Sequence, residues 1–297
     1  MYLPKTYSDE IYYDSITTLV GDIYYANNSY RSKIADMRVL AEHIIRRLIK
    51  YSPKDKLELG DYRTRTALKK AGVTEGFFWH AFDILHGMGN DSSHSKKTVM
   101  PTKEDFDRAT NAILHLYAYM FFDYFKKYPF GSSEKVMSAF SLLPPFLRLT
   151  VLGELLDLDK SNMDVVKKIR LVMVKTLGLE GAMEMVEHHK EEWATISVPY
   201  SSTDLKEKLE RYNWDYVKAM SEMQESLYDY FVRELPCIKI LGDYPLYTTY
   251  EEAKKYYLEH GILEGTSPEI TEFNSLMKYI YTGRKINEDT LHDPIFN

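Results

Sequence analysis

The chain has 297 residues, enough for one large domain or two smaller ones, and its 44% hydrophobic content supports a packed core rather than a disordered protein. Its single cysteine, Cys237, excludes an internal disulfide and any zinc site that needs several cysteines. The first ten residues are polar and no apolar run approaches about 18 residues, so we expect a cytoplasmic protein without a membrane-spanning helix.

The total charge of −6 hides a basic stretch between Arg31 and Lys70. This stretch holds twelve Lys and Arg residues against five Asp and Glu, a local charge of +7. Such a surface can bind the phosphates of nucleic acid. It can equally be a solvated helix face, or a patch that docks on an acidic surface of a second subunit. The candidates for RNA contact, in this stretch and just beyond the second predicted helix, are Arg46, Arg47, Lys50, Lys96 and Lys97.

Three helices are predicted in the first part of the chain. Residues 34–51 place apolar side chains at the three- and four-residue steps of an amphipathic helix, which Ser52-Pro53 ends. Residues 74–89 are bulky on several faces and are expected to form a buried helix. Thr102-x-x-Asp105 has the pattern of a capping box, and the long helix that it starts is expected to run to Lys127.

The rest of the chain is also predicted to be helical. The "YPFGSS" segment at 128–133 is the candidate boundary between a bundle over residues 1–130 and a helical extension over residues 131–297. The only plausible strand pair is residues 236–247. The fold class is therefore all-α with at most one short strand pair. The further helices are expected within residues 141–158, 163–196, 204–235, 250–261 and 268–283.

Residues 85–94, "LHGMGNDSSH", are predicted to form the tight turn between the second and third helices. Gly87 and Gly89 would permit the backbone angles and close approach that such a turn needs. In the purely structural interpretation, His94 is a buried histidine that pairs with Glu42 of the first helix. In the functional interpretation, the same polar groups form a site.

The segment lacks the patterns of three common kinds of site. His80, His86 and His94 are separated by five and seven residues, not by the four-residue step that puts two metal ligands on one helix face. The Gly-x-Gly follows no strand and has no third glycine, so it is not a phosphate-binding loop. Ser92 and Ser93 lack a nucleophile elbow. We therefore expect no metal, no cofactor and no small-molecule enzyme.

The chain resembles the HEPN superfamily (higher eukaryotes and prokaryotes nucleotide-binding), and most of all its branch of unknown function that accompanies restriction and phage-defence proteins. The resemblance covers about residues 30–127. It rests on Arg38-x-x-x-Glu42, an aromatic helix, the Gly-Asn-x-small-small-His segment that ends at His94, and a long helix rich in Leu and Tyr. It implies a helical bundle whose motif turn lies beside the first helix, commonly at a two-fold dimer interface. A homodimer is therefore expected.

Active members of the superfamily are metal-independent endoribonucleases with an Arg-Asn-(three residues)-His type of motif. A histidine can move the proton as the RNA 2′-hydroxyl attacks the adjacent phosphate, and an arginine can stabilise the charge. The resemblance implies His94 and Asn90 as site residues, with His86, Arg38 and Glu42 beside them.

This chain departs from that motif. It has Gly89 where the arginine usually stands, and His86 where the most similar branch often has one. A histidine replaces a permanent bidentate cation poorly. Arg38 can lean across to the turn, or it can simply pair with Glu42.

The missing arginine favours a non-catalytic HEPN-like interaction module in prokaryotic phage defence or counter-defence, which dimerises and binds a protein partner. The alternative is a metal-independent endoribonuclease or RNA-binding protein that uses Asn90 and His94. The sequence does not decide whether the chain is an enzyme.

Overall fold

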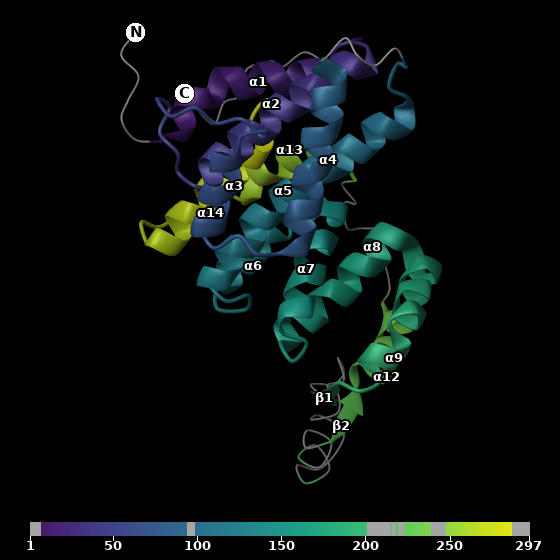
Figure 1. Ribbon diagram of the computed structural model, residues 1–297. Coiled ribbons are helices and arrows are strands. Elements are labelled where there is room, and N and C mark those ends of the chain that lie inside the picture. Colours follow the sequence, from purple (N-terminus) through teal and green to yellow (C-terminus); the bar gives the residue numbers. More distant parts are fainter. Residues whose placement is uncertain are drawn as a thin grey trace. The chain divides into compact units, whose positions relative to one another are not determined.

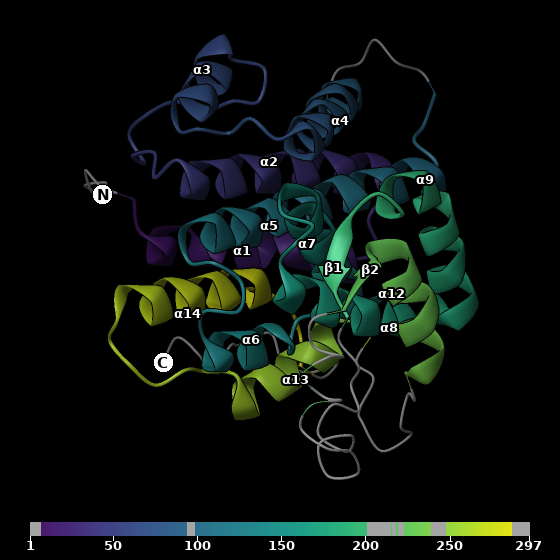
Figure 2. The same ribbon diagram turned by 90° about the horizontal axis from the view of Figure 1, so that it is seen from below.

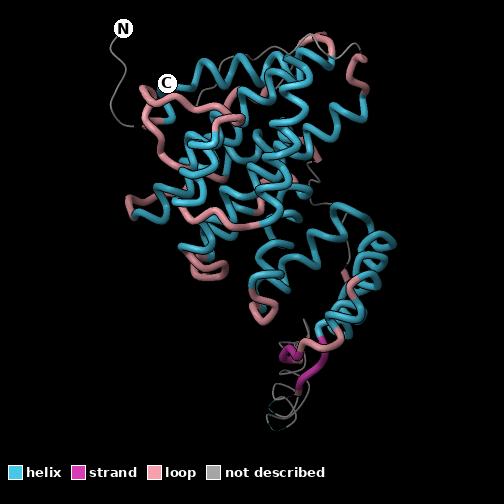
Figure 3. Tube along the Cα trace, in the orientation of Figure 1, coloured by secondary structure: helices cyan, strands magenta, loops and turns pink. Residues whose placement is uncertain are grey.

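The computed structural model confirms the predicted all-α fold: the described part is helical apart from one short antiparallel strand pair (Figure 3). Within the described part of the chain, no helix is long and apolar enough to cross a bilayer. Contacts within the chain divide it into two compact units. The structure describes residues 7–93, 99–200, 215, 218, 223–238 and 248–286.

Unit 1 comprises Met1–Pro129, Glu134–Leu143 and Thr249–Asn297 (Figure 1). A 3-10 turn η1 leads into its first helix, and a π-helical turn η2 follows that helix. The elements of unit 1 are η1 (Asp9–Tyr12), α1 (Tyr13–Val20), η2 (Gly21–Tyr25), α2 (Tyr30–Leu48), α3 (Tyr62–Lys70), α4 (Gly76–Ser93), α5 (Lys103–Lys127), α6 (Glu134–Phe140), α13 (Tyr250–His260) and α14 (Pro268–Tyr281).

Helices α2, α4 and α5 pack against one another and form the core of unit 1 (Figures 1 and 2). The predicted apolar stripe of α2 is buried, from Ile34 to Ile45. Burial of each large aliphatic side chain contributes about 1.5–3 kcal/mol, so this stripe fixes the face that α2 turns inward. The capping box at Thr102 is confirmed, since Thr102 and Asp105 each accept a hydrogen bond from the backbone N–H of the other.

The predicted turn at residues 85–94 is wrong for its described part, because α4 continues as a helix to Ser93. Gly87 and Gly89 both keep negative φ values. Gly89 serves close packing instead: a Cβ there would lie 2.6 Å from Cδ of Arg38 on α2. The glycine therefore lets the arginine stem cross α4, and it does not end the helix.

Unit 2 comprises Phe130–Ser133 and Pro144–Thr248. Its two long helices pack on each other, and the second is broken at Gly178, whose φ of 73° suits glycine. The strands pair antiparallel, with Ser197 opposite Ser226. The elements of unit 2 are α7 (Pro145–Leu158), α8 (Met163–His188), α9 (Lys190–Trp193), β1 (Ser197–Pro199), β2 (Gln224–Ser226), α12 (Leu227–Glu234) and η3 (Leu235–Cys237).

Two sequence predictions for unit 2 need correction. The strand pair does not start at residue 236, since Leu235–Cys237 is a 3-10 turn, while residues 239–247 lie outside the described ranges. Strand β2 also interrupts the helix predicted over residues 204–235. The reason is pairing with β1, a contact between distant residues that helical spacing alone does not reveal.

The chain passes into unit 2 at Phe130, beside the predicted boundary, but it returns to unit 1 at Thr249. This division differs from a C-terminal domain over residues 131–297. Helix α14 packs on α5, where the rings of Tyr124 and Phe273 lie 5.5 Å apart. Aromatic pairs at this separation add to the area that they bury, so the last helix belongs to the core of unit 1.

Candidate functional site

A polar cluster joins α2 and α4 around Asn90. Its amide oxygen accepts a hydrogen bond from Nη1 of Arg38, and its Nδ2 lies 2.9 Å from Nε2 of His86. Since arginine can only donate, the bond from Arg38 fixes which amide atom is the oxygen. Nδ2 then donates to Nε2, so the neutral His86 ring carries its proton on Nδ1. We call Arg38, Asn90 and His86 the α2–α4 cluster.

Glu42 closes one side of the cluster. Its Oε1 lies 3.6 Å from Nε of Arg38 and accepts a hydrogen bond from the backbone N–H of Leu59 at 3.1 Å. Burial raises the pKa of Glu42, and the Leu59 N–H and the Arg38 charge offset only part of that effect. On the same segment, a Cβ on Gly60 would lie 3.1 Å from Nε2 of His86. The loop before α3 thus contacts both an acid and a base of the site.

The pKa of His86 lies below its ordinary value, chiefly because burial disfavours the charged ring and then because Arg38 and Arg65 repel it. Asp83 opposes this shift, but Asp83 also pairs with Arg65. At neutral pH His86 is therefore an uncharged base beside a fixed cation. A neutral imidazole next to a guanidinium can accept a proton while the cation holds an anion.

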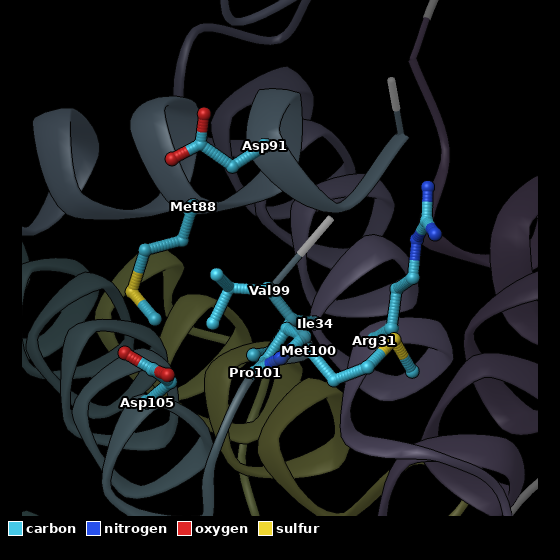
Figure 4. Close-up of a pocket in the computed structure, with 8 residues that line it drawn as sticks. All are labelled: Arg31, Ile34, Met88, Asp91, Val99, Met100, Pro101 and Asp105. Carbon is cyan, nitrogen blue, oxygen red and sulfur yellow. The ribbon is translucent and has the colours of Figure 1, made fainter. Parts of the chain in front are cut away.

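A pocket of about 170 Å³ lies between the start of α2, the last part of α4 and the start of α5 (Figure 4). Its α4 residues, Met88 and Asp91, lie on a different flank of that helix from His86 and Asn90. Apolar side chains from both helices and from the segment before α5 form most of its wall, with charged groups at the edges. The lining residues are Arg31, Ile34, Met88, Asp91, Val99, Met100, Pro101 and Asp105.

The structure brings four predicted site residues together: Arg38, Glu42, His86 and Asn90. Arg38 both leans across to α4 and faces Glu42, so the two alternatives read from the sequence hold at once. His94, Lys96 and Lys97 lie outside the described residues, and with them the predicted contact between Glu42 and His94.

The remaining candidates for RNA contact make internal contacts. Arg47 is buried, with Nε 3.0 Å from Oδ1 of Asp9 and Nη2 2.7 Å from Oγ of Ser275. Arg46 donates from Nη1 to two backbone carbonyls, of Ser52 and Asp55. Lys50 is exposed, and its ammonium lies 5.4 Å from the centre of the Tyr7 ring. Part of the basic stretch is thus used to hold unit 1 together.

Sequence reasoning missed the backbone of Leu59 and Gly60 and the packing role of Gly89. A glycine within a stretch of helical spacing was the available signal for a close helix crossing. No group of three or more His, Cys, Asp or Glu within the described ranges could hold a metal ion. No family model, curated protein or solved structure matches the chain.

Proposed function

We propose that the α2–α4 cluster binds RNA and supports its metal-independent cleavage, in a HEPN-like protein of the cytoplasm that takes part in phage defence or counter-defence. The observation that carries the proposal is the bridge that Asn90 makes between a guanidinium and an imidazole. The sequence motif lacks its arginine, and Arg38 from α2 supplies that charge at the side chain of Asn90. The reason to prefer a non-catalytic module is thereby weakened.

The exposure of Arg38 supports a ligand at this point. Its side chain is 19% exposed, and Nη1 and Nε face Asn90 and Glu42. Among the residues that the structure describes, Nη2 makes no hydrogen bond. A guanidinium recognises phosphate through such N–H groups, so Nη2 can donate to a phosphate oxygen without breaking the bond to Asn90.

The proposed reaction is attack of the RNA 2′-hydroxyl on the adjacent phosphorus. Nε2 of His86 gives up the bond from Nδ2 of Asn90 and takes the hydroxyl proton, the 2′-oxygen forms a bond to phosphorus, and the bond from phosphorus to the 5′-oxygen breaks. Arg38 stabilises the extra negative charge on the phosphate as it forms. The leaving 5′-oxygen takes a proton from an acid, for which His94 is the sequence candidate. The products are a 2′,3′-cyclic phosphate and a 5′-hydroxyl.

Cleavage of single-stranded RNA in EDTA tests the proposal. We expect the wild type to produce 2′,3′-cyclic ends, and Arg38→Gln and His86→Ala each to slow cleavage by at least about 100-fold. His80→Ala is the matched control, because His80 lies on the same helix, is exposed and has no contact with the cluster. His94→Ala tests the proposed acid. Equal rates in the wild type and both cluster variants would exclude catalysis there.

A second candidate is the non-catalytic module that dimerises and binds a protein partner. Glu42 favours it, because this carboxylate faces Arg38 and also holds Leu59, so the whole cluster can act as a polar tie between α2, α4 and the loop before α3. Under this candidate, RNA is neither cut nor bound. A stable dimer by light scattering and a partner retained by folded His86→Ala would support it.

A further inference from the structure

Two arginines from different helices contact the same face of α4. Arg38 of α2 bonds to Asn90, and Arg65 of α3 forms an ion pair with Asp83. Asp83 lies three residues before His86 and Asn90 lies four residues after it, so the three side chains share one face of the helix. Asp83 and Asn90 are about 10 Å apart along the helix axis. The two guanidinium groups therefore reach α4 on either side of the proposed base, and after burial both lower its pKa.

Helix α3 and the rings of α4 hold Arg65 in position. Its guanidinium carbon lies 4.6 Å from the centre of the Phe82 ring and 5.5 Å from that of Trp79. Helix α3 is anchored by Leu68, which is fully buried, and by Thr64, whose Oγ1 donates to a backbone carbonyl of the preceding loop at 2.8 Å. A guanidinium that rests on aromatic rings loses less conformational freedom when it binds a ligand.

The ion pair with Asp83 leaves Arg65 able to bind an anion. The two side chains are 39% and 57% exposed, and an ion pair as exposed as this contributes little to stability. Among the described residues, the pair uses Nη2 of Arg65, and its Nε and Nη1 donate no hydrogen bond. Guanidinium groups bind phosphate through pairs of such N–H donors. Arg65 therefore keeps donors for a phosphate while Nη2 faces Asp83.

We infer that Arg65 binds a second phosphate of the RNA, next to the one that meets Arg38, an inference that rests on the proposed function. The 2′-hydroxyl that His86 deprotonates belongs to a ribose with one phosphate on its 3′ side and one on its 5′ side. The 3′ phosphate is attacked and meets Arg38. Because Arg65 reaches α4 on the other side of His86, it is placed for the 5′ phosphate. The ligand is therefore single-stranded RNA with at least two phosphates, not a mononucleotide.

Fluorescence anisotropy with a labelled single-stranded RNA decamer tests the inference. The probe is a random-sequence pool with methylated 2′-hydroxyls, which cannot be cleaved, and the full chain is used in EDTA. We expect Arg65→Gln to weaken binding at least about tenfold and to reduce the salt dependence by about one phosphate, a slope of roughly 0.7. Arg63→Gln is the matched control, because Arg63 lies on the same helix, is 60% exposed and pairs with its neighbour Asp61. It should weaken binding less than about twofold.

Asp83→Asn separates phosphate binding from a structural role. Arg65→Gln and Asp83→Asn break the same ion pair, so a purely structural role predicts weaker RNA binding in both. Phosphate binding predicts opposite signs, because the Asp83 carboxylate repels the phosphate and competes for the same N–H groups. We expect Asp83→Asn to bind the decamer about threefold more tightly and to lose this gain in the Arg65→Gln background. Weaker binding in both single variants would overturn the inference.

Short substrates test the direction of the strand. The dinucleotides NpN, pNpN and NpNp, where N is an equal mixture of the four bases and p is phosphate, contain the same cleavable bond. We expect the 5′ phosphate to raise kcat/KM at least about tenfold in the wild type and not in Arg65→Gln. The 3′ phosphate should have a smaller effect. Equal gains from the two phosphates would overturn the assignment of Arg65 to the 5′ side.

The outcomes also distinguish the two proposals. If Arg38→Gln weakens decamer binding and both Arg65→Gln and Asp83→Asn match the wild type, the RNA site stands and the second phosphate contact is overturned. If the wild type neither binds nor cleaves any of these RNAs, the proposed function fails and the role of Arg65 fails with it.

Discussion

Helix α2 carries two arginines in different settings, and the difference between them indicates which one can serve a ligand. Arg47 is 6% exposed and lies between a carboxylate, a hydroxyl and the Tyr279 ring, whose centre is 4.9 Å from the guanidinium. Arg38 is 19% exposed and bonds to the neutral amide of Asn90. Two arginines of one helix thus differ in exposure: Arg47 is buried in the core, and Arg38 is partly exposed to solvent.

The carboxylates that face the two arginines also differ, in the direction of their pKa shifts. Burial alone would raise the pKa of Asp9, but Arg47 and the hydroxyls of Tyr7 and Ser275 lower it below the ordinary value. Glu42, beside Arg38, keeps a raised pKa because its partners offset less of the burial. A fully satisfied ion pair suits the core, whereas an incompletely satisfied one suits a site that exchanges partners.

The largest expected effect on the free energy of unfolding comes from replacing Arg47. Arg47 is buried, and Arg47→Met leaves the half-buried Asp9 carboxylate without its cation, so we expect unit 1 to lose about 3 kcal/mol of unfolding free energy. Arg38→Met should cost less than about 1 kcal/mol, since its ion pair with Glu42 is part-exposed. Urea denaturation of the two variants measures the contrast. Equal losses would contradict the division into a packing arginine and a site arginine.

The next effect is on the pH dependence of stability, and we expect it from His43. This residue lies between Arg38 and Arg47 along α2. Burial and then Arg46 lower its pKa to about 4, and its Nε2 lies 3.1 Å from Oγ of Ser15. An unfolded histidine titrates near 6.5, so below that pH the unfolded chain binds more protons than the folded one. His43 therefore stabilises the protein above pH 6.5, and this contribution is lost as the pH falls to about 4.

The loss amounts to at most about 3 kcal/mol, from the shift in the pKa of His43. His43→Gln should flatten the fall in urea midpoint between pH 6.5 and 4, while His115→Gln on α5 should follow the wild type. A wild-type slope that persists in His43→Gln would show that other groups cause the acid sensitivity.

Gly89→Ala tests the close crossing of α2 and α4 at Arg38. The new methyl would lie 2.6–2.9 Å from three carbons of Arg38, so we expect a loss of about 1–3 kcal/mol from overpacking. RNA binding should weaken as well, because Arg38 would be displaced from Asn90. Thermal unfolding and fluorescence anisotropy with a labelled single-stranded RNA decamer measure the two consequences.

The smallest effect is expected from Gly87→Ala, two residues before Gly89. A Cβ on Gly87 meets nothing within 4 Å, and the residue lies inside α4 with negative φ. Gly87→Ala should therefore raise stability by about 0.5–1 kcal/mol through helix propensity and leave RNA binding unchanged. If Gly87→Ala destabilised the protein as much as Gly89→Ala, the close crossing at Gly89 would not be the cause.

Local patterns were enough to predict most helices and part of the site. The apolar spacing in α2 and the cap at Thr102 depend only on neighbouring residues, and both are confirmed. The end of α4 was missed because two glycines and an Asn-Asp pair suit a turn and a close crossing equally well. Contact of Arg38 with α4 was foreseen as one of two alternatives.

The burial of Arg47 could not be read from the sequence. Its partners Asp9 and Ser275 lie 38 and 228 residues away, and no local pattern joins them. For the same reason α13 and α14 were assigned to a C-terminal extension, although they complete unit 1. Long-range contacts of this kind require the fold itself.

That arrangement has a consequence during synthesis. The sealed ion pair around Arg47 needs Ser275 of α14, but residues 144–248 of unit 2 are translated before α14. At 5–20 residues per second, this insertion delays the closing helix by roughly 5–20 s. The nascent first part of unit 1 therefore waits with its α14-facing apolar surface uncovered. This interval is when a chaperone would gain most from binding, and a chain terminated after α12 would never complete its first unit.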